Sequence, residues 1–281
     1  MRFEKWQALG NDYLIVEADS LPWELTAGRV RRLCDPHFGV GSDGVLLLSR
    51  SDDPELVAEL RIFNPDGSEA ELSGNGAREA ILYLRRHGWT DRDTFSIRTA
   101  AGPITPTITS ERICSVDMGR ASTTSKDFPD GGPDGRGSLN AVGHEWAFQH
   151  VSIGNPQCAI EVGGELESLD LAEIGPPVEG HELFPNRTNV SFFRVTGSGV
   201  RARIFERGVG ETLSSGTGAS GAAVAAFLNG TPSPITVELD GGELEVEVSP
   251  DLSVRLTGWA EPICSGELSP ELLAALGRLD D

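Results

Sequence analysis

Positive charge is scarce in this chain, because 23 Lys and Arg stand against 43 Asp and Glu and leave a net charge of −20. Such a field repels phosphate backbones and anionic lipids, so we expect no binding to nucleic acid or to a membrane surface. Long apolar runs are also missing, since none approaches the roughly 18 residues that span a bilayer. The charged first six residues do not resemble a secretory signal. A small-molecule partner is therefore favoured.

Cysteine is equally sparse, and its four copies are too far apart for a CxxC motif or a zinc-binding spacing. The histidines show no metal-ligand spacing either. This pattern predicts a reduced, cytoplasmic protein without a metal site. All four cysteines are expected to be core residues, since they stand in or beside apolar stretches; they are Cys34, Cys114, Cys158 and Cys264.

The chain contains an internal repeat. Residues 61–77 read RIFNPDGSEAELSGNGA and residues 203–219 read RIFERGVGETLSSGTGA, which agree at eight of 17 positions without a gap. A second pair, Gly10-Asn11 and Gly154-Asn155, lies at nearly the same offset. Because the offset is about half of the 281 residues, the repeat predicts a duplicated domain.

In each copy the SGxGA segment is followed by a stretch typical of a helix, over residues 77–86 and 219–228. Short apolar or alternating runs predict strands around these helices. Each half should therefore hold several strands and one central helix, in an α+β fold. The Gly-, Pro- and Asp-rich residues 121–143 are interpreted as the linker between the halves. The predicted strands cover residues 45–48, 60–63, 113–118, 158–162, 190–195, 235–239, 244–248 and 253–256.

A serine that opens a helix leaves backbone N–H groups free to bind a carboxylate or a phosphate. One such loop is more often an ordinary capped helix. Two pseudo-symmetric copies could instead converge on one small anion from opposite sides, which suits a reaction at both faces of one carbon. The Glu206-Arg207 pair follows the second Arg-Ile-Phe, and its charges could recognise the ammonium and carboxylate groups of an amino acid.

Ordered motifs extend this pattern along nearly the whole chain. They include ALGNDYLIVE, LCDPHFGVGSDG, SIGNPQ, FPNRTNVSF and GWAEPICSGEL, together with the two repeated segments. With these motifs the sequence resembles the diaminopimelate epimerases, which are cofactor-independent amino-acid isomerases of lysine and cell-wall biosynthesis. The resemblance implies two pseudo-symmetric domains, each a small barrel of strands around a central helix, with the active site in the cleft. It places residues 1–120 with 263–281 in one domain and residues 121–262 in the other.

The resemblance also implies the site residues, a substrate that is an amino acid, no cofactor, and a possible homodimer. The catalytic positions are Ser73 and Ser215. The residues that match the family's substrate contacts are Asn11, Asn64, Asn155, Asn189, Glu206 and Arg207, and the backbone nests for the reacting carboxylate are Gly74-Asn75 and Gly216-Thr217.

The chain departs from the family at the catalytic pair. The family has cysteine at both positions, where Ser73 and Ser215 stand here, and it usually has histidine where Gln157 stands. A serine hydroxyl is a far weaker acid than a thiol, so its alkoxide is scarcely populated without a partner base. The sequence therefore leaves three hypotheses open: a slow or engineered epimerase, another isomerase or dehydratase of the same fold, and a catalytically silent protein that only binds an amino acid.

Overall fold

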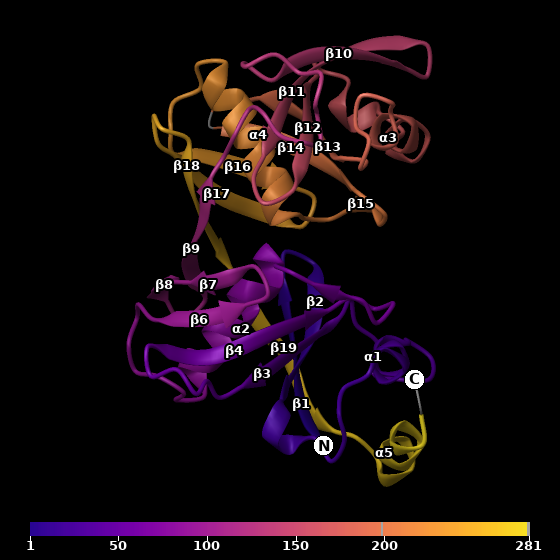
Figure 1. Cartoon of the computed structure of the whole chain (residues 1–281), viewed down its shortest axis with the longest axis vertical. Helices are drawn as coiled ribbons and strands as arrows, with labels where there is room; N and C mark the ends of the chain where they lie inside the picture. Colours follow the sequence, from indigo (N-terminus) through magenta and orange to yellow (C-terminus); the bar gives the residue numbers. More distant parts are fainter. Residues whose placement is uncertain (198, 280–281) are drawn as a thin grey trace. The chain divides into compact units, whose positions relative to one another are not determined.

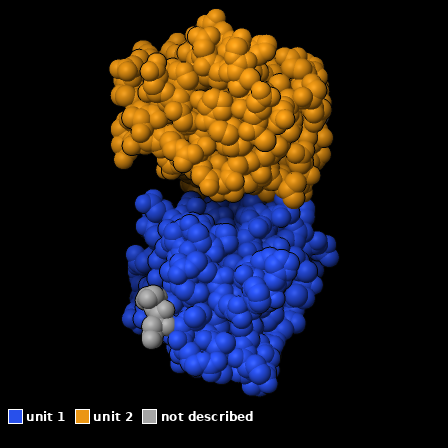
Figure 2. All heavy atoms as spheres, turned by 90° about the vertical axis from the view of Figure 1, so that its right-hand side faces the viewer, with its two compact units in different colours: residues 1–116, 258–281 blue, residues 117–257 orange. Residues whose placement is uncertain are grey.

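The computed structural model describes residues 1–197 and 199–279, and the chain divides into two compact units. Unit 1 comprises Met1–Val116 and Gly258–Asp281, and unit 2 comprises Asp117–Thr257. Figure 2 colours the two units separately. The chain passes from one to the other along strands β9 (Ile113–Arg120) and β18 (Ser253–Trp259). Each unit mixes strands with few helices, as expected for an α+β fold.

Unit 1 is built on one mixed sheet in the order β19-β1-β2-β3-β4-β6-β7, with β5 added beside β4. Helix α2 (Gly74–Arg86) packs against β1, β2 and β3, and its buried face includes Ala77, Ala80, Ile81 and Leu84. The C-terminal strand β19 pairs antiparallel with the N-terminal β1. The strands are β1 (Arg2–Ala8), β2 (Asn11–Glu17), β3 (Val45–Ser49), β4 (Leu56–Phe63), β5 (Glu69–Ala70), β6 (Ser96–Thr99), β7 (Gly102–Ile104) and β19 (Glu261–Glu267), and β8 (Thr107–Ser110) pairs with β9.

Unit 2 wraps its strands around helix α4 (Gly216–Leu228), as Figure 1 shows. The helix packs against at least six of these strands. Because the helix is enclosed, it needs small residues: a Cβ at Gly218 would lie 2.8 Å from Ile204 Cγ2. The sheet runs β10-β11-β12-β13-β14-β16-β17-β18-β9-β8, with β15 beside β14. The strands are β10 (Arg136–Ala141), β11 (His144–Ser152), β12 (Pro156–Glu161), β13 (Asn189–Val195), β14 (Gly199–Glu206), β15 (Gly210–Thr212), β16 (Ile235–Leu239) and β17 (Gly242–Val248).

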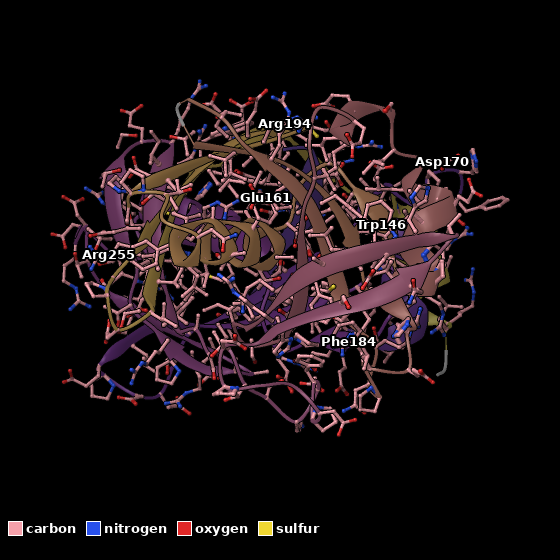
Figure 3. All side chains as sticks on the ribbon, turned by 90° about the horizontal axis from the view of Figure 1, so that it is seen from above. Trp146, Glu161, Asp170, Phe184, Arg194 and Arg255 are labelled. Carbon is pink, nitrogen blue, oxygen red and sulfur yellow. The ribbon has the colours of Figure 1, made fainter. Side chains whose placement is uncertain are left out.

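A second apolar core in unit 2 lies on the other side of this sheet. Its aromatic rings include Trp146 and Phe184, both labelled in Figure 3. The ring centroid of Trp146 is 5.7 Å from that of Phe192, and the ring centroid of Phe184 is 5.6 Å from that of Phe128. Helix α3 (Leu171–Glu179) begins at the cap Asp170, whose carboxylate accepts from the backbone N–H groups of residues 172 and 173.

The two predicted central helices are confirmed, each beginning three residues earlier than expected. Seven of the eight predicted strands lie within observed strands, and the eighth, residues 158–162, extends one residue past the end of β12. The structure adds further short helices that the sequence did not predict. Helices α1 (Ala27–Cys34) and α5 (Pro270–Gly277) also lie in unit 1, and α3 in unit 2. These are short helices that cover sheet faces, and their local apolar pattern is too brief to be distinctive.

The linker prediction for residues 121–143 is also wrong. This segment belongs to unit 2, contains β10, and buries Phe128 and Leu139 in the core. Its Gly- and Pro-rich composition comes from turns, and β10 forms an antiparallel hairpin with the next strand, β11, which belongs to unit 2. Cysteine burial needs one correction as well: Cys34, Cys114 and Cys158 are buried, but Cys264 is exposed on the edge strand β19.

Candidate functional site

The repeated segment forms the same substructure in both units. Arg-Ile-Phe lies at the end of a central strand, which finishes at Phe63 in one copy and at Glu206 in the other. A short hairpin strand pairs back onto it, and a serine then caps a helix. The repeated Arg and Glu form an ion pair across this hairpin in each copy, Arg61–Glu69 at 2.8 Å and Arg203–Glu211 at 2.7 Å. Five of the eight repeated residues are therefore explained: the Arg and Glu by the hairpin ion pair, and two Gly and one Ala by the small-residue helix start that follows Ser73 or Ser215.

Ser73 is the N-cap of α2 and is half-buried. Its Oγ accepts a hydrogen bond from the backbone N–H of Gly76 at 3.1 Å and another from the Tyr13 hydroxyl at 3.4 Å. The first turn of the helix carries no acidic residue, so the positive end of its dipole is not neutralised from within the turn. The cap therefore presents a hydroxyl oxygen in a positive field.

Ser215 is the N-cap of α4 and is only 5% exposed. Its Oγ accepts from the backbone N–H of Gly218 at 3.3 Å and donates to Glu206 Oε2 at 3.0 Å. The other carboxylate oxygen of Glu206 accepts from Thr212 Oγ1 at 2.8 Å. Burial raises the pKa of Glu206 above its ordinary value, although the hydrogen bonds from Thr212 and Ser215 act in the opposite direction. Ser215 thus has a carboxylate partner that the sequence did not reveal.

The expected binding residues of unit 1 form one connected group and one separate turn. Asn75 donates to Asn11 at 3.3 Å and accepts from the fully buried Arg78 at 2.5 Å, while Asn11 donates to Asp43 at 3.0 Å. Arg78 also donates to the carbonyl of Gly74 at 3.0 Å. Asn64 instead orders its own turn, in which its amide group donates to Ser68 Oγ at 3.0 Å.

In unit 2, Gln157 holds Asn155 in place beside the start of α4. Gln157 Nε2 donates to Asn155 Oδ1 at 2.6 Å, and Asn155 Nδ2 donates to Thr217 Oγ1 at 3.3 Å. Gln157 is fully buried, packed so that a Cβ at Gly221 would lie 2.8 Å from its Cγ. Gln157 is therefore a buried hydrogen-bonding residue next to the capped helix.

Asn189 and Arg207 join β13 to the turn that follows β14. Asn189 Oδ1 accepts from the backbone N–H of Arg207 at 2.9 Å, and its amide donates to the carbonyl of Pro156 at 3.0 Å. The guanidinium of Arg207 is exposed and donates to the carbonyl of Asn186 at 3.0 Å. The two charges of the Glu206-Arg207 pair thus have different partners: the carboxylate binds Ser215, and the guanidinium is open to solvent.

Three contributing residues were not anticipated from the sequence: Tyr13, Arg78 and Thr212. Each forms a hydrogen bond with a predicted residue: Tyr13 with Ser73 across 60 positions, Arg78 with Asn75 within helix α2, and Thr212 with Glu206 across the hairpin. Only Arg78 carried a local signal, because it follows SGNGA directly. Across residues 1–197 and 199–279, no cluster of three or more His, Cys, Asp or Glu side chains is arranged to hold a metal ion. No helix in the described part of the chain is long and apolar enough to cross a membrane.

Comparison with known proteins shows which family the chain resembles over most of its length. The family model described as diaminopimelate epimerase matches residues 3–124 and 149–261. The chain is 42% identical over 278 residues to the diaminopimelate epimerase of Synechococcus sp. strain JA-3-3Ab, with 95% of this chain and 97% of that one covered. It is 39% identical over 280 residues to diaminopimelate epimerase 2 of Nostoc sp. strain PCC 7120, with 98% of each chain covered.

Solved structures of lower identity share the fold. A phenazine biosynthesis protein of the PhzF family from Bacillus anthracis superposes with a TM-score of 0.70 at 18% identity, over 96% of this chain and 99% of that one. A probable proline racemase from Agrobacterium radiobacter K84 gives a TM-score of 0.68 at 15% identity, over 97% and 95% of the two chains. These similarities concern architecture, and both units take part in them.

Proposed function

Because the chain belongs to the diaminopimelate epimerase family, we propose that it interconverts the LL and meso forms of diaminopimelate in lysine and cell-wall biosynthesis, without PLP or metal. The observation that carries this proposal is the pair of serine-capped helix starts, one in each repeat, each surrounded by the polar residues that match the family's substrate contacts. Inverting an α-carbon requires one group to remove its proton and another to return a proton to the opposite face.

Ser73 and Ser215 are the groups we assign to these two roles. The backbone N–H groups at the starts of α2 and α4 would hold the reacting carboxylate, with Asn11, Asn75, Asn155 and Thr217 beside them. Glu206 supports the proton-accepting role of Ser215, since the hydroxyl already donates to its carboxylate at 3.0 Å. When Ser215 takes the α-proton, its own proton can pass to Glu206, so a free alkoxide is not required.

The distal amino-acid end would be held by Asn64, Asn189 and Arg207. Arg207 is the sharpest test, because its exposed guanidinium offers the bidentate geometry that a carboxylate prefers. We expect Arg207→Ala to weaken diaminopimelate binding by roughly 10- to 100-fold, the equivalent of about 1.5–3 kcal/mol for a charged hydrogen bond. Isothermal calorimetry measures this affinity. Arg255→Ala, which removes a solvent-exposed arginine of β18, is the matched control, and equal affinities in all three proteins would remove Arg207 from the site.

Two other functions stay open because serine stands at both catalytic positions: another isomerase or dehydratase reaction, and amino-acid binding without chemistry. Deuterium incorporation at Cα distinguishes them. Purified protein in D₂O should exchange the α-proton of diaminopimelate but not that of proline, hydroxyproline or lysine. Exchange confined to another amino acid would favour a different isomerase, and no exchange despite measurable binding would favour the silent binder.

The resemblance also predicts a homodimer, and the cysteine pattern predicts a cytoplasmic location; both stay predictions. The exposed edge strand β19, with Ile263 at 53% exposure, is compatible with pairing between copies. Light scattering on the purified chain measures the oligomeric state directly.

A further inference from the structure

The phenol of Tyr13 reaches the cap of helix α2 from a different element. Tyr13 lies in β2, its side chain is 5% exposed, and its hydroxyl donates to Ser73 Oγ at 3.4 Å. The two residues are 60 positions apart, so the contact depends on the packing of α2 against β2. Nothing in the proposed function assigns a role to this tyrosine.

The ring has a space made for it by Gly44. A Cβ at position 44 would lie 2.5 Å from Tyr13 Cε1 and 2.9 Å from Tyr13 Cδ1, which is too close for any residue with a side chain. The same glycine accepts the backbone N–H of Leu14 at 3.0 Å, immediately before β3 pairs with β2. The position of the phenol is therefore determined by the sheet itself, and its hydroxyl has little freedom to move away from Ser73.

The two capping serines consequently have opposite surroundings. Ser73 Oγ accepts from two donors, the Tyr13 hydroxyl and the Gly76 N–H. Ser215 donates its own proton to the carboxylate of Glu206. Donors stabilise negative charge on an oxygen, whereas a neighbouring carboxylate opposes it.

We propose that Tyr13 is a positioning residue for Ser73 and that its hydroxyl, by donating a hydrogen bond, stabilises negative charge on the side chain at position 73. Ser215, in contrast, is hydrogen-bonded so that it can pass its proton to Glu206. This inference rests on the proposed epimerase function. In the resulting step, the α-carbon gives its proton to Ser215 and the hydroxyl proton of Ser215 moves to Glu206. Ser73 then gives its proton to the opposite face of the carbon. The charge left on Ser73 is held by Tyr13 and Gly76, so protons and charge balance.

The test replaces each serine in turn with cysteine, because the ionisation of a thiol can be measured without substrate. Cys264→Ser provides the background, since the other three native cysteines are buried and burial raises the pKa of Cys114, for example, to about 12. In the Ser73→Cys variant we expect Tyr13→Phe to raise the pKa of the introduced thiol and to slow its alkylation at pH 7 about tenfold. Phenylalanine keeps the ring in the space beside Gly44, and Arg78, Glu79, Asp12 and Asp43, the charged groups around this end of α2, are unchanged.

The Ser215→Cys variant is the matched control. There Tyr13→Phe should leave the alkylation profile unchanged, whereas Glu206→Gln should speed alkylation because it removes a negative neighbour. Thermal unfolding confirms that each variant is folded. An alkylation profile of the Ser73→Cys thiol that is the same with and without the tyrosine hydroxyl would overturn the role of Tyr13. Failure of the epimerase proposal would instead appear as absent Cα exchange, which this thiol titration does not measure.

Discussion

At the scale of single residues, the catalytic question reduces to two hydroxyl groups with different neighbours. Ser73 is hydrogen-bonded to the phenol of Tyr13, and Ser215 is hydrogen-bonded to the carboxylate of Glu206. Both serines cap helices whose first turns lack acidic residues. The helix starts favour a negative charge at both positions. A hydroxyl uses that field poorly because its pKa is far above neutrality, whereas a thiol, with an ordinary pKa near 8.5, uses it well.

The first prediction follows from this difference in acidity. Ser73→Cys and Ser215→Cys introduced together should raise the rate of diaminopimelate epimerisation by orders of magnitude. Either single change should have a much smaller effect, because one thiol completes only half of the proton transfer. Deuterium exchange at Cα, followed by NMR, measures all four proteins. A double variant no faster than the starting protein on any amino acid tested would show that the two positions do not share the reaction.

Glu79 gives a second residue-scale prediction, which concerns stability. It is fully buried in α2 next to the buried Arg78, and burial raises its pKa well above the ordinary value of 4.5, while Arg78 partly opposes this. The folded state therefore holds a proton that the unfolded state releases, so the free energy of unfolding should fall as pH rises above about 4.5 toward the folded pKa.

Glu79→Gln should remove that contribution, because an amide does not titrate. The variant should gain stability relative to the original protein between pH 5 and pH 8, as measured by urea unfolding at several pH values. Glu173→Gln, at an exposed position of α3, is the control. A constant difference between the two proteins across this range would show that Glu79 does not titrate on unfolding.

At the scale of elements, the helix α4 shows packing overriding helix propensity. Glycine in a helix interior costs about 1 kcal/mol relative to alanine, yet α4 keeps Gly218 and Gly221 inside it. The surrounding strands leave no room for a larger side chain, since a Cβ at Gly221 would lie 2.8 Å from Gln157 Cγ and 2.9 Å from Gln157 Cβ. Close approach of the helix to β12 therefore depends on these glycines.

Gly221→Ala should accordingly destabilise the protein, because overpacking costs about 1–3 kcal/mol and exceeds the gain in propensity. The free energy of unfolding should fall by about 1 kcal/mol, and the midpoint of urea unfolding should shift to a lower urea concentration. Gly164→Ala is the control, since a Cβ there meets nothing within 4 Å. A more stable Gly221→Ala protein would mean that β12 moves away from the helix at little cost.

At the scale of the whole molecule, the dominant property is the net charge of −20. Like charges repel in the compact state, and this repulsion is screened within about 8 Å at physiological ionic strength. We expect the melting temperature to rise by a few degrees between 10 mM and 300 mM NaCl, as calorimetry would show. Sucrose of equal osmolality is the control, because it is uncharged and does not screen the repulsion. A melting temperature that falls with added NaCl would mean that ion pairs such as Arg201–Glu167 outweigh the repulsion.

Local and repeated patterns by themselves determined the α+β class, the duplication, the two capped helices and the eight strands, because each depends on neighbouring residues or on self-similarity. The same patterns identified Ser73 and Ser215 as equivalent positions. Only the tertiary structure decided what those serines contact: Tyr13 reaches Ser73 across 60 residues, and the side chain of Glu206 turns to Ser215 rather than to Arg207. It also decided that residues 121–143 belong to unit 2, because β10 pairs with β11. The Tyr13–Ser73 contact arises from the packing of elements distant in sequence, whereas the Ser215–Glu206 contact and the β10–β11 pairing arise from the way neighbouring segments fold back on each other. No periodicity within a segment encodes either kind of contact.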